Sequence, residues 1–392
     1  MGSVRAVKAV DGTATQLSGR DAAGRCILSV LAKRTYLFGA NGESTVHATQ
    51  LPLVVEPRYA EDRFVLEEDR DLWAFKPQTD VVVLGHAYNH RSRPGFSAGV
   101  SVGKAMKSIA VSGDRRCTVG YDGRLLFSAP TILERVPLSY AFAYGGRDSV
   151  AQETYGNPVE LLKPFLPPET DPAAIDAASP FVYPRNPAGR GYLVEATKAA
   201  VQALVLPNLE HPEDLLTPER LAAGETGRWP LQPVPASLGW LDYGAFPRAA
   251  WLGVLADHEE GLDPQRVGEI RLGYCKPDIL AEKDPPDPLT FEGANGASLG
   301  LRVPHLKGGE TIELLNVSPK RETIRLRLPA ERPKLWIDGR ESNLLATAPP
   351  VIHSVAIEPD KQLFTIVWCG SAPARRPYLP DELKTMPFAA EW

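Results

Sequence analysis

Residues 75–88 are Phe75-Lys76-Pro77-Gln78-Thr79-Asp80-Val81-Val82-Val83-Leu84-Gly85-His86-Ala87-Tyr88. Four apolar residues follow Asp80 without interruption, and three of them are β-branched. This length and composition are typical of a strand that is covered on both faces, and Gly85 ends it. The stretch therefore predicts a fully buried β-strand.

Short β-like segments and turns continue from this strand to Asp148. Between residues 99 and 112, valine and isoleucine alternate with small residues. Gly113-Asp114 and Asp122-Gly123 supply turns between further short segments. No helical period runs through this block, so we expect strands joined by turns.

The composition limits the classes of partner. The chain of 392 residues has 43 basic and 48 acidic side chains, a formal net charge of -5. Phosphate binding needs clustered lysine and arginine, and no basic run here is longer than two residues, so we expect no nucleic-acid partner. Proline accounts for 37 residues, nearly twice the usual ~5%. This content disfavours a helix bundle and favours strands joined by long ordered loops.

The cysteines and the N-terminal residues indicate a compartment. Cys26, Cys117, Cys275 and Cys369 lie far apart and form no CxxC pair, which favours free thiols over a disulfide framework or a zinc site. The first residues lack the apolar core and cleavage site of a signal peptide. No apolar run approaches the roughly 18 residues of a membrane span. We expect a cytoplasmic protein that does not bind a membrane.

Local patterns predict elements on both sides of the central block. Residues 25–38 predict one or two strands, and Asn41-Gly42 predicts a hairpin that returns through residues 44–55. Residues 194–204 are rich in alanine at helical spacing, and Thr217-Pro218 predicts a helix start.

Strand patterns return in the last quarter of the chain. Ile324, Leu326 and Leu328 alternate with polar residues, which predicts a half-buried strand. Residues 355–358 and 363–368 flank a turn and predict a hairpin.

These patterns predict a mainly β protein with antiparallel sheets, arranged as a sandwich or a barrel, with long Pro-rich loops and a few short helices. We expect an N-terminal β-rich region over residues 1–148 and a loop-rich middle region with short helices over residues 149–299. A C-terminal β module over residues 300–371 and an extended tail over residues 372–392 complete the expected division.

Two fragments match catalytic patterns only in part. Residues 95–99 fit G-x-S-x-G, but a nucleophile elbow needs a strand before the serine and a helix after it, and neither is expected here. Residues 99–104 fall one residue short of a phosphate loop and enter a β segment. We predict that the chain is not an enzyme and holds no cofactor.

Charged and imidazole side chains lie within and after the central strand in the sequence. His86 and His90 are four residues apart, but no helix is expected there to place them on one face. A loop metal site of Asp80, His86 and His90 stays open beside ordinary hydrogen-bonded loop histidines. The cluster Asp114-Arg115-Arg116 predicts a turn with a carboxylate–guanidinium pair rather than an active site.

Five aromatic residues stand at irregular spacing among proline and glycine: Trp229, Trp240, Tyr243, Phe246 and Trp251. Side chains in such a pattern plug the base of loops or present a surface to a partner. Plugging is the commoner role, and a partner surface is the functional alternative.

Short motifs follow one another in order from Lys33 to Glu210. Their residues, called the fingerprint residues below, are Lys76, Pro77, Thr79, Asp80, Gly85, Gly113, Asp114, Arg115, Tyr144, Gly145, Gly146, Asn157, Pro158, Asn186, Pro187, Gly189, Gly191, Pro207 and Asn208. No single motif is diagnostic. Their order resembles that of a bacterial family catalogued as a domain of unknown function (DUF2169), which is found beside type VI secretion effectors.

The resemblance implies an effector adaptor or chaperone. Such a protein binds a cognate toxin and loads it onto the secreted spike, built from VgrG and PAAR proteins. Residues 157–187 and the aromatic residues named above would supply the binding surfaces. Cys117 stands where the family pattern has an aromatic residue, and residues 274–310 are poorer in tryptophan than that pattern, so the cargo stays open.

Two other classes of function stay open at this point. One is a metal-dependent or other hydrolase that uses Asp80, His86 and His90. The other is a carbohydrate-binding or structural β module, suggested by the aromatic residues and the C-terminal strands. Bound metal in the pure protein favours the first, and glycan binding without a toxin partner favours the second.

Overall fold

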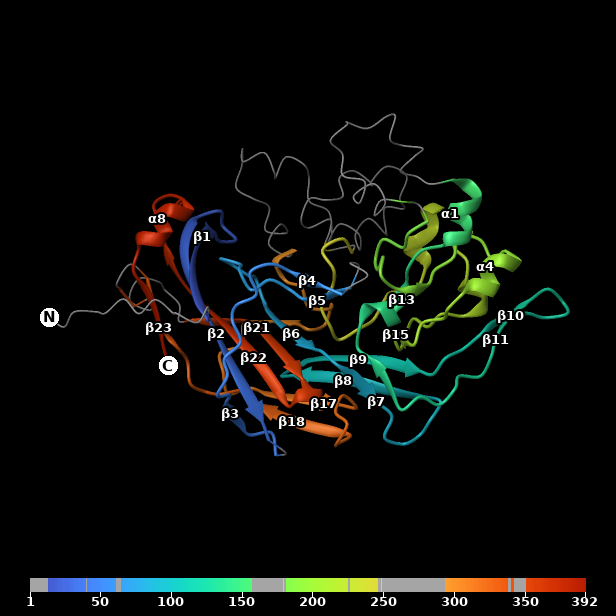
Figure 1. The fold of residues 1–392 in the computed structure, drawn as a ribbon, viewed down its shortest axis with the longest axis horizontal. Helices are drawn as coiled ribbons and strands as arrows, with labels where there is room; N and C mark the ends of the chain where they lie inside the picture. Colours follow the sequence, from blue (N-terminus) through green and yellow to red (C-terminus); the bar gives the residue numbers. More distant parts are fainter. Residues whose placement is uncertain are drawn as a thin grey trace.

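The structure, a computed structural model, describes residues 13–39, 41–60, 65–156, 179, 181–224, 226–245, 248, 293–337, 340–341 and 350–392. Asn157, Pro158, Phe246 and Trp251 lie outside these residues, as does most of the Pro-rich stretch 157–187. Within the described part of the chain the fold is mainly β, with antiparallel sheets and a few short helices (Figure 1). The predicted fold class is confirmed.

The larger sheet brings together strands from both ends of the sequence. Its strands are β1 (Ala14–Arg20), β2 (Cys26–Phe38), β3 (Ser44–Val46), β6 (Thr79–Val83), β16 (Arg302–Val303), β21 (Val351–Glu358) and β22 (Leu363–Pro373). Their order is β1-β2-β22-β21-β6-β16, with β3 beside β2. Neighbours run antiparallel except β21 and β6, which are parallel.

The second sheet has five antiparallel strands. They are β8 (Gly95–Val102), β9 (Ala105–Ser112), β15 (Leu209–Glu210), β17 (Thr311–Leu315) and β18 (Thr323–Arg327), in the order β15-β9-β8-β17-β18. Ile324 and Leu326 of β18 face inward, which confirms the predicted half-buried strand. The G-x-S-x-G match at residues 95–99 is the first part of β8 and pairs regularly with β9, so it is no elbow.

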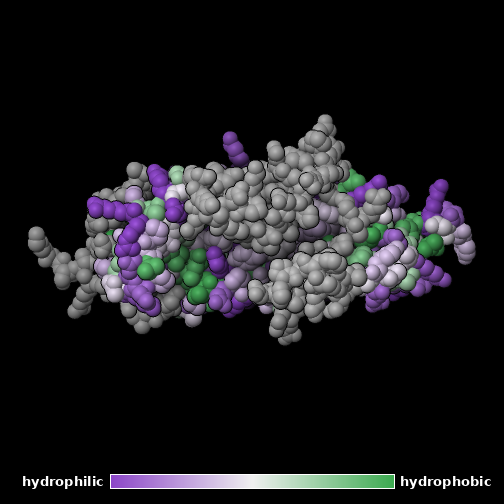
Figure 2. All heavy atoms as spheres, turned by 90° about the horizontal axis from the view of Figure 1, so that it is seen from above, coloured by the Kyte–Doolittle hydropathy of each residue, from purple (hydrophilic) through white to green (hydrophobic). Residues whose placement is uncertain are grey.

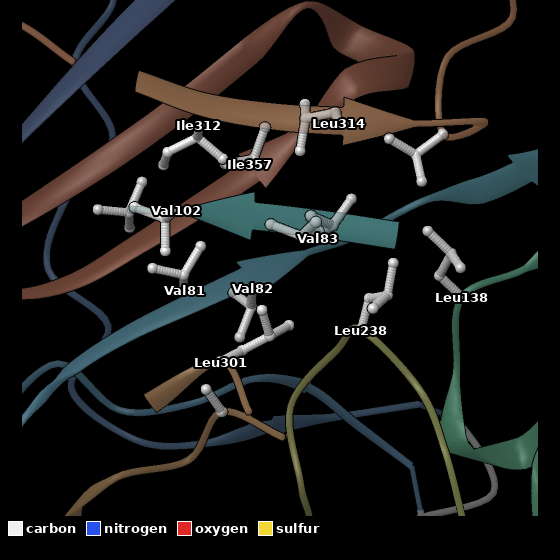
Figure 3. Packing of buried hydrophobic residues seen from close by; sticks show 14 of the residues in the cluster. Val81, Val82, Val83, Val102, Leu138, Leu238, Leu301, Ile312, Leu314 and Ile357 are labelled. Carbon is white, nitrogen blue, oxygen red and sulfur yellow. The ribbon is translucent and has the colours of Figure 1, made fainter. Parts of the chain in front are cut away.

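The two sheets pack face to face around one core, as in a sandwich. Val81, Val82 and Val83 of β6 are each 0% exposed, which confirms the strand predicted from residues 75–88. Figure 3 shows them gathered with Val102 and Leu314 from the second sheet. Burial of each valine contributes about 1.5–3 kcal/mol, so this strand anchors the core.

Shorter strands form small sheets around the sandwich. They are β4 (Arg58–Tyr59) with β5 (Leu66–Glu68), β7 (His86–Tyr88) with β12 (Arg135–Pro137), β10 (Cys117–Val119) with β11 (Leu125–Phe127), β13 (Tyr144–Gly145) with β14 (Arg190–Gly191), and β19 (Lys334–Ile337) with β20 (Arg340–Glu341) and β23 (Phe388–Glu391). The helices are α1 (Ser149–Tyr155), α4 (Lys198–Ala203) and α8 (Pro380–Thr385), and the 3-10 turns are η1 (Tyr140–Phe142), η3 (Pro218–Arg220), η4 (Thr226–Leu231) and η7 (Pro359–Lys361).

The helices are shorter than the sequence pattern predicts. Over residues 194–204 only α4 is helical, and it begins after Thr197, whose hydroxyl accepts a hydrogen bond from the N–H of Ala200. Thr217 starts only the 3-10 turn η3, because its side chain makes no capping bond. None of the described helices has the length and apolar character needed to cross a membrane.

Both predicted hairpins form. β3 returns along β2 after the turn at Gly42, and β22 returns along β21 after η7. Around Gly42 the returning strand is shorter than expected, since only residues 44–46 pair with β2.

The expected boundaries at residues 148, 299 and 371 do not separate sheets. β22 lies between β2 and β21, and β21 pairs with β6, so the N-terminal and C-terminal regions share one sheet. The residues after 371 are not an extended tail, because they complete β22 and form α8 and β23, which pairs with β19. Local sequence patterns do not show which distant strands pair, so the sequence did not predict this arrangement.

Candidate functional site

Lys76 and Asp80 form a buried ion pair at the start of β6. Lys76 Nζ lies 2.7 Å from Asp80 Oδ2, and the two side chains are 2% and 0% exposed. The carboxylate also accepts hydrogen bonds from Asn295 Nδ2 and from the backbone N–H groups of Gly296 and Ala297. Burial by itself raises the pKa of Asp80, but Lys76, Arg302 and the Ala297 N–H hold that pKa below its usual value. The carboxylate is therefore ionised, and its hydrogen bonds link β6 to residues 295–297.

Glycines and Asn186 shape the place where β13 and β14 meet. Asn186 Nδ2 donates to the carbonyls of Tyr140 at 2.8 Å and Tyr144 at 3.0 Å. Gly145 and Gly146 have φ of 144° and 91°, and a Cβ at Gly145 would lie 2.3 Å from the Asn186 carbonyl oxygen. Only glycine fits there, so these fingerprint residues build a turn.

The remaining fingerprint residues in the described part of the chain also serve the fold. The Thr79 hydroxyl donates to the carbonyl of Ile352 and accepts from the N–H of Leu306, which ties β6 to its neighbours. The others lie in turns or packed backbone: Pro77, Gly85, Gly113, Pro187, Gly189, Gly191 and Pro207.

Asp114 and Arg115 lie in the predicted turn, but they do not pair with each other. Arg115 Nη2 lies 2.6 Å from Glu210 Oε2 and also donates to the carbonyl of Pro207. Asp114 Oδ1 accepts from Asn208 Nδ2 at 3.0 Å. The predicted pair is therefore wrong, because Glu210 reaches Arg115 from a distant strand.

Asp80, His86 and His90 do not converge. His86 Nδ1 lies 2.8 Å from Asp360 Oδ2, and Tyr88 donates to the other oxygen of Asp360 at 2.7 Å. His90 Nε2 lies 2.9 Å from the Ser318 carbonyl. Among the described residues no group of three or more histidine, cysteine or acidic side chains is placed to hold a metal ion.

The aromatic residues between 229 and 245 pack inward. Trp240 is 6% exposed and belongs to the main core, so it plugs the sandwich. The Tyr243 hydroxyl donates to Asp69, and the Arg248 guanidinium lies 3.9 Å from the Tyr243 ring centre. Trp229 is half-buried against the second hydrophobic cluster, around α1 and α4. The described aromatic residues therefore contribute mainly to packing inside the protein.

One polar cluster was not visible in the sequence. Lys107 Nζ donates to Ser298 Oγ at 2.7 Å, and the Tyr140 hydroxyl lies 2.7 Å from the same oxygen. Burial lowers the pKa of Lys107 to about 8, and Arg302 adds to the effect. A serine between a lysine and a tyrosine has the chemistry of an activated nucleophile. Ser298 is only 1% exposed, however, so its hydroxyl does not face solvent.

A cavity of about 500 Å³ opens beside this cluster. Residues of β4 and β5, the end of β6 and the turns η1 and η7 line it, and Gly85, Tyr140 and Trp240 belong to its wall. Four of its five charged side chains are already paired, Arg58 with Glu68 and Lys361 with Glu358, and the fifth is Glu67. The cavity therefore has mixed polarity and no described cluster of unpaired charge.

A family model described as "Uncharacterized protein conserved in bacteria (DUF2169)" matches residues 23–369. The chain belongs to this family. The match covers both sheets of the sandwich except β1 and the last residues of β22, and it extends well beyond the last fingerprint residue. Searches of curated proteins and of solved structures found no match.

This member of DUF2169 carries a projecting hairpin with apolar side chains in solvent. β10 and β11 extend from one end of the molecule, opposite the end that holds α8 and β23 (Figure 1). Val119 and Leu126 are 51% and 53% exposed, and Tyr121 at the tip is fully exposed. Figure 2 shows hydrophobic and hydrophilic residues side by side at this end. We call six of the exposed residues of this hairpin the hairpin surface: Arg116, Thr118, Val119, Tyr121, Arg124 and Leu126.

Proposed function

We propose that the protein is an adaptor that binds a protein partner through the hairpin surface. The observation that carries the proposal is the solvent exposure of Val119, Tyr121 and Leu126 on one projecting hairpin. Apolar side chains grouped in this way mark surfaces that a partner covers. Tyrosine is enriched among the residues that dominate binding energy, so Tyr121 is the expected anchor.

Membership in DUF2169 and the resemblance to adaptors of type VI secretion support a more specific form of the proposal. The cargo is a cognate effector toxin, and the second partner is the VgrG or PAAR component of the spike. Loading takes place in the cytoplasm of the producing cell. Binding is non-covalent and needs no cofactor.

The fingerprint residues stabilise the fold while the hairpin surface stays exposed, which agrees with this role. The described fingerprint residues are committed to ion pairs, turns and strand contacts, so they hold the sandwich rigid. Rigid β scaffolds commonly present binding residues on the segments that they support. The hairpin surface is such a segment.

The hydrolase alternative has weaker support. The pairing of His86 with Asp360 resembles the orientation of a catalytic imidazole, but no described serine or cysteine side chain bonds to His86. Ser298 has a lysine partner, yet it is 1% exposed. The adaptor proposal needs no rearrangement of either group.

A pull-down tests the proposal. The tagged full-length protein is mixed with the toxin and the spike proteins encoded beside it, and we expect both to be recovered. The variant Tyr121→Ala with Leu126→Asp should lose most of the recovered toxin or spike. Met106→Asp, which changes a residue that is 75% exposed elsewhere on the second sheet, is the matched control. Recovery of neither partner by the wild type refutes the adaptor role, and equal recovery by the hairpin variant refutes the role of the hairpin.

A further inference from the structure

We propose that the β10–β11 hairpin takes up an extended acidic segment of the partner as an additional β-strand. In this arrangement an apolar side chain of the segment covers Leu126, and its carboxylates meet Arg116 and Arg124. The inference rests on the proposed function only in that the segment belongs to a protein partner.

The charge around the hairpin differs in sign from that of the whole chain. Residues 89–135 contain eight lysines and arginines but three acidic residues, a formal net charge of +5, whereas the chain carries -5. Three of the basic residues are already paired, Arg91 with Glu322, Arg115 with Glu210 and Arg124 with Asp122. The remaining positive charge favours a segment rich in aspartate and glutamate.

The hairpin has backbone groups free to accept a strand. The N–H of Ser128 donates to the carbonyl of Arg116, and the N–H of Gly120 donates to that of Arg124. Hydrogen-bonded and non-hydrogen-bonded pairs alternate along an antiparallel ladder, so the backbone groups of Cys117, Val119, Leu125 and Phe127 point away from the partner strand. No hydrogen bond from another described residue ends on these groups. Open edges of this kind are where extended peptides add as strands.

The two faces of the hairpin differ. Cys117, Leu125 and Phe127 pack against the second hydrophobic cluster, which includes residues of α4. The opposite face turns Leu126 to solvent.

On this open face, Leu126 lies between two arginines. Thr118 stands directly opposite Leu126, and Arg116 and Arg124 occupy the positions two residues away along each strand. The Arg116 guanidinium has no partner among the described residues, and Arg124 meets only Asp122 at the tip, with its side chain 85% exposed. An added strand matches this row when acidic and apolar residues take turns at every second position, because only every second side chain lies on this face.

A nucleic acid fits the same surface less well. Single strands bind to series of aromatic platforms along a basic groove, and Tyr121 is the one exposed aromatic residue of the hairpin. An apolar Leu126 between two arginines, with a free backbone edge, suits a peptide strand instead.

Fluorescence anisotropy with the full-length protein tests the proposal. The probe is a fluorescein-labelled peptide of about ten residues in which glutamate and valine take turns at every second position, with threonine between them. We expect it to bind about tenfold or more tighter than the same peptide with lysine in place of glutamate, and less tightly as salt is raised.

Two further comparisons separate charge from backbone pairing. Arg116→Glu with Arg124→Glu should weaken binding about tenfold or more, while Lys104→Glu with Arg375→Glu, two exposed residues outside the hairpin, should not. Two further peptides carry methyl groups on every second backbone nitrogen, one on the odd-numbered and the other on the even-numbered residues. Only one of these two sets of N–H groups faces the hairpin in an added strand. One of the two methylated peptides should therefore bind like the parent, and the other about tenfold more weakly.

Equal binding of the lysine peptide, equal loss in both methylated registers, or tighter binding of a single-stranded oligothymidylate overturns the proposal. The assay contains no toxin and no spike. Peptide binding without recovery in the pull-down therefore refutes the adaptor role alone. Recovery in the pull-down without peptide binding refutes strand addition alone.

Discussion

At the residue scale, the described fingerprint residues make hydrogen bonds, ion pairs and close backbone contacts inside the protein. Asp80, the acidic member of the metal site considered from the sequence, is neutralised by Lys76 and accepts three further hydrogen bonds inside the protein. Charged groups that are fully buried in this way cost several kcal/mol when one partner is removed.

We therefore expect Asp80→Asn to lower the free energy of unfolding by about 3–5 kcal/mol, because Lys76 is left as an uncompensated buried charge. Urea denaturation measures this loss. Asp21→Asn is the control, since the exposed Arg25–Asp21 pair contributes about 1 kcal/mol or less. Equal urea midpoints for the two variants contradict the structural role of Asp80.

Lys107 makes the stability of the protein depend on alkaline pH. Its pKa in the folded protein is lowered to about 8, chiefly by burial, whereas an unfolded lysine titrates near ~10.4. The unfolded state therefore binds more protons between these values, and stability rises with pH across that window.

The wild type should accordingly gain stability relative to Lys107→Met as the pH rises from about 8 to about 10. Thermal denaturation of both proteins over that range gives the difference. Lys104→Met, which removes an exposed amine between β8 and β9, should show a difference that does not change with pH. If the stability difference between the wild type and Lys107→Met does not change with pH, the pKa of Lys107 is not lowered.

At the element scale, the turn between β2 and β3 packs against the other sheet. Gly42 has φ of 81°, and a Cβ there would lie 1.4 Å from the carbonyl oxygen of Arg325 in β18. The Asn-Gly signal predicted a hairpin, but not that its turn closes the gap between two sheets.

Gly42→Ala should lower the free energy of unfolding by about 2–4 kcal/mol, because it adds a clash to the strain of positive φ. Gly103→Ala is the matched control, with φ of 58° and no atom within 4 Å of the added Cβ. It should lose only about 1 kcal/mol. Chemical denaturation of both variants measures the difference, and similar losses show that the clash is relieved.

At the scale of the whole molecule, the fold closes through its last strands. β22 lies between β2 and β21, in the interior of the larger sheet, although it comes near the end of the chain. A chain that lacks it leaves two strands with open edges and loses Trp368 and Phe364, which are both 0% exposed in the core of the intact fold.

A chain ending at residue 350 should therefore fail to unfold cooperatively, whereas one ending at residue 374 should still do so with reduced stability. The second chain keeps the larger sheet and loses only α8 and β23, which cover β1 and β19. Circular dichroism during urea denaturation, with limited proteolysis, distinguishes the two. A cooperative transition in the shorter chain shows that the two regions fold independently.

The sequence alone predicted the mainly β class, the buried strand at Val81 to Val83, the half-buried β18 and the two hairpins. Each depends on alternation or turn chemistry within a few residues, where the backbone and its immediate neighbours decide the conformation. Ordered short motifs likewise indicated the family, because they need no knowledge of contacts.

Only the tertiary structure decided which distant groups meet. The parallel pairing of β21 with β6, the ion pair of Arg115 with Glu210 and the contact of Lys107 with Ser298 join residues that are far apart in the chain. Their partners are selected by the packing of two sheets, which no local pattern encodes. The hairpin surface became visible for the same reason, because exposure depends on what the rest of the chain leaves uncovered.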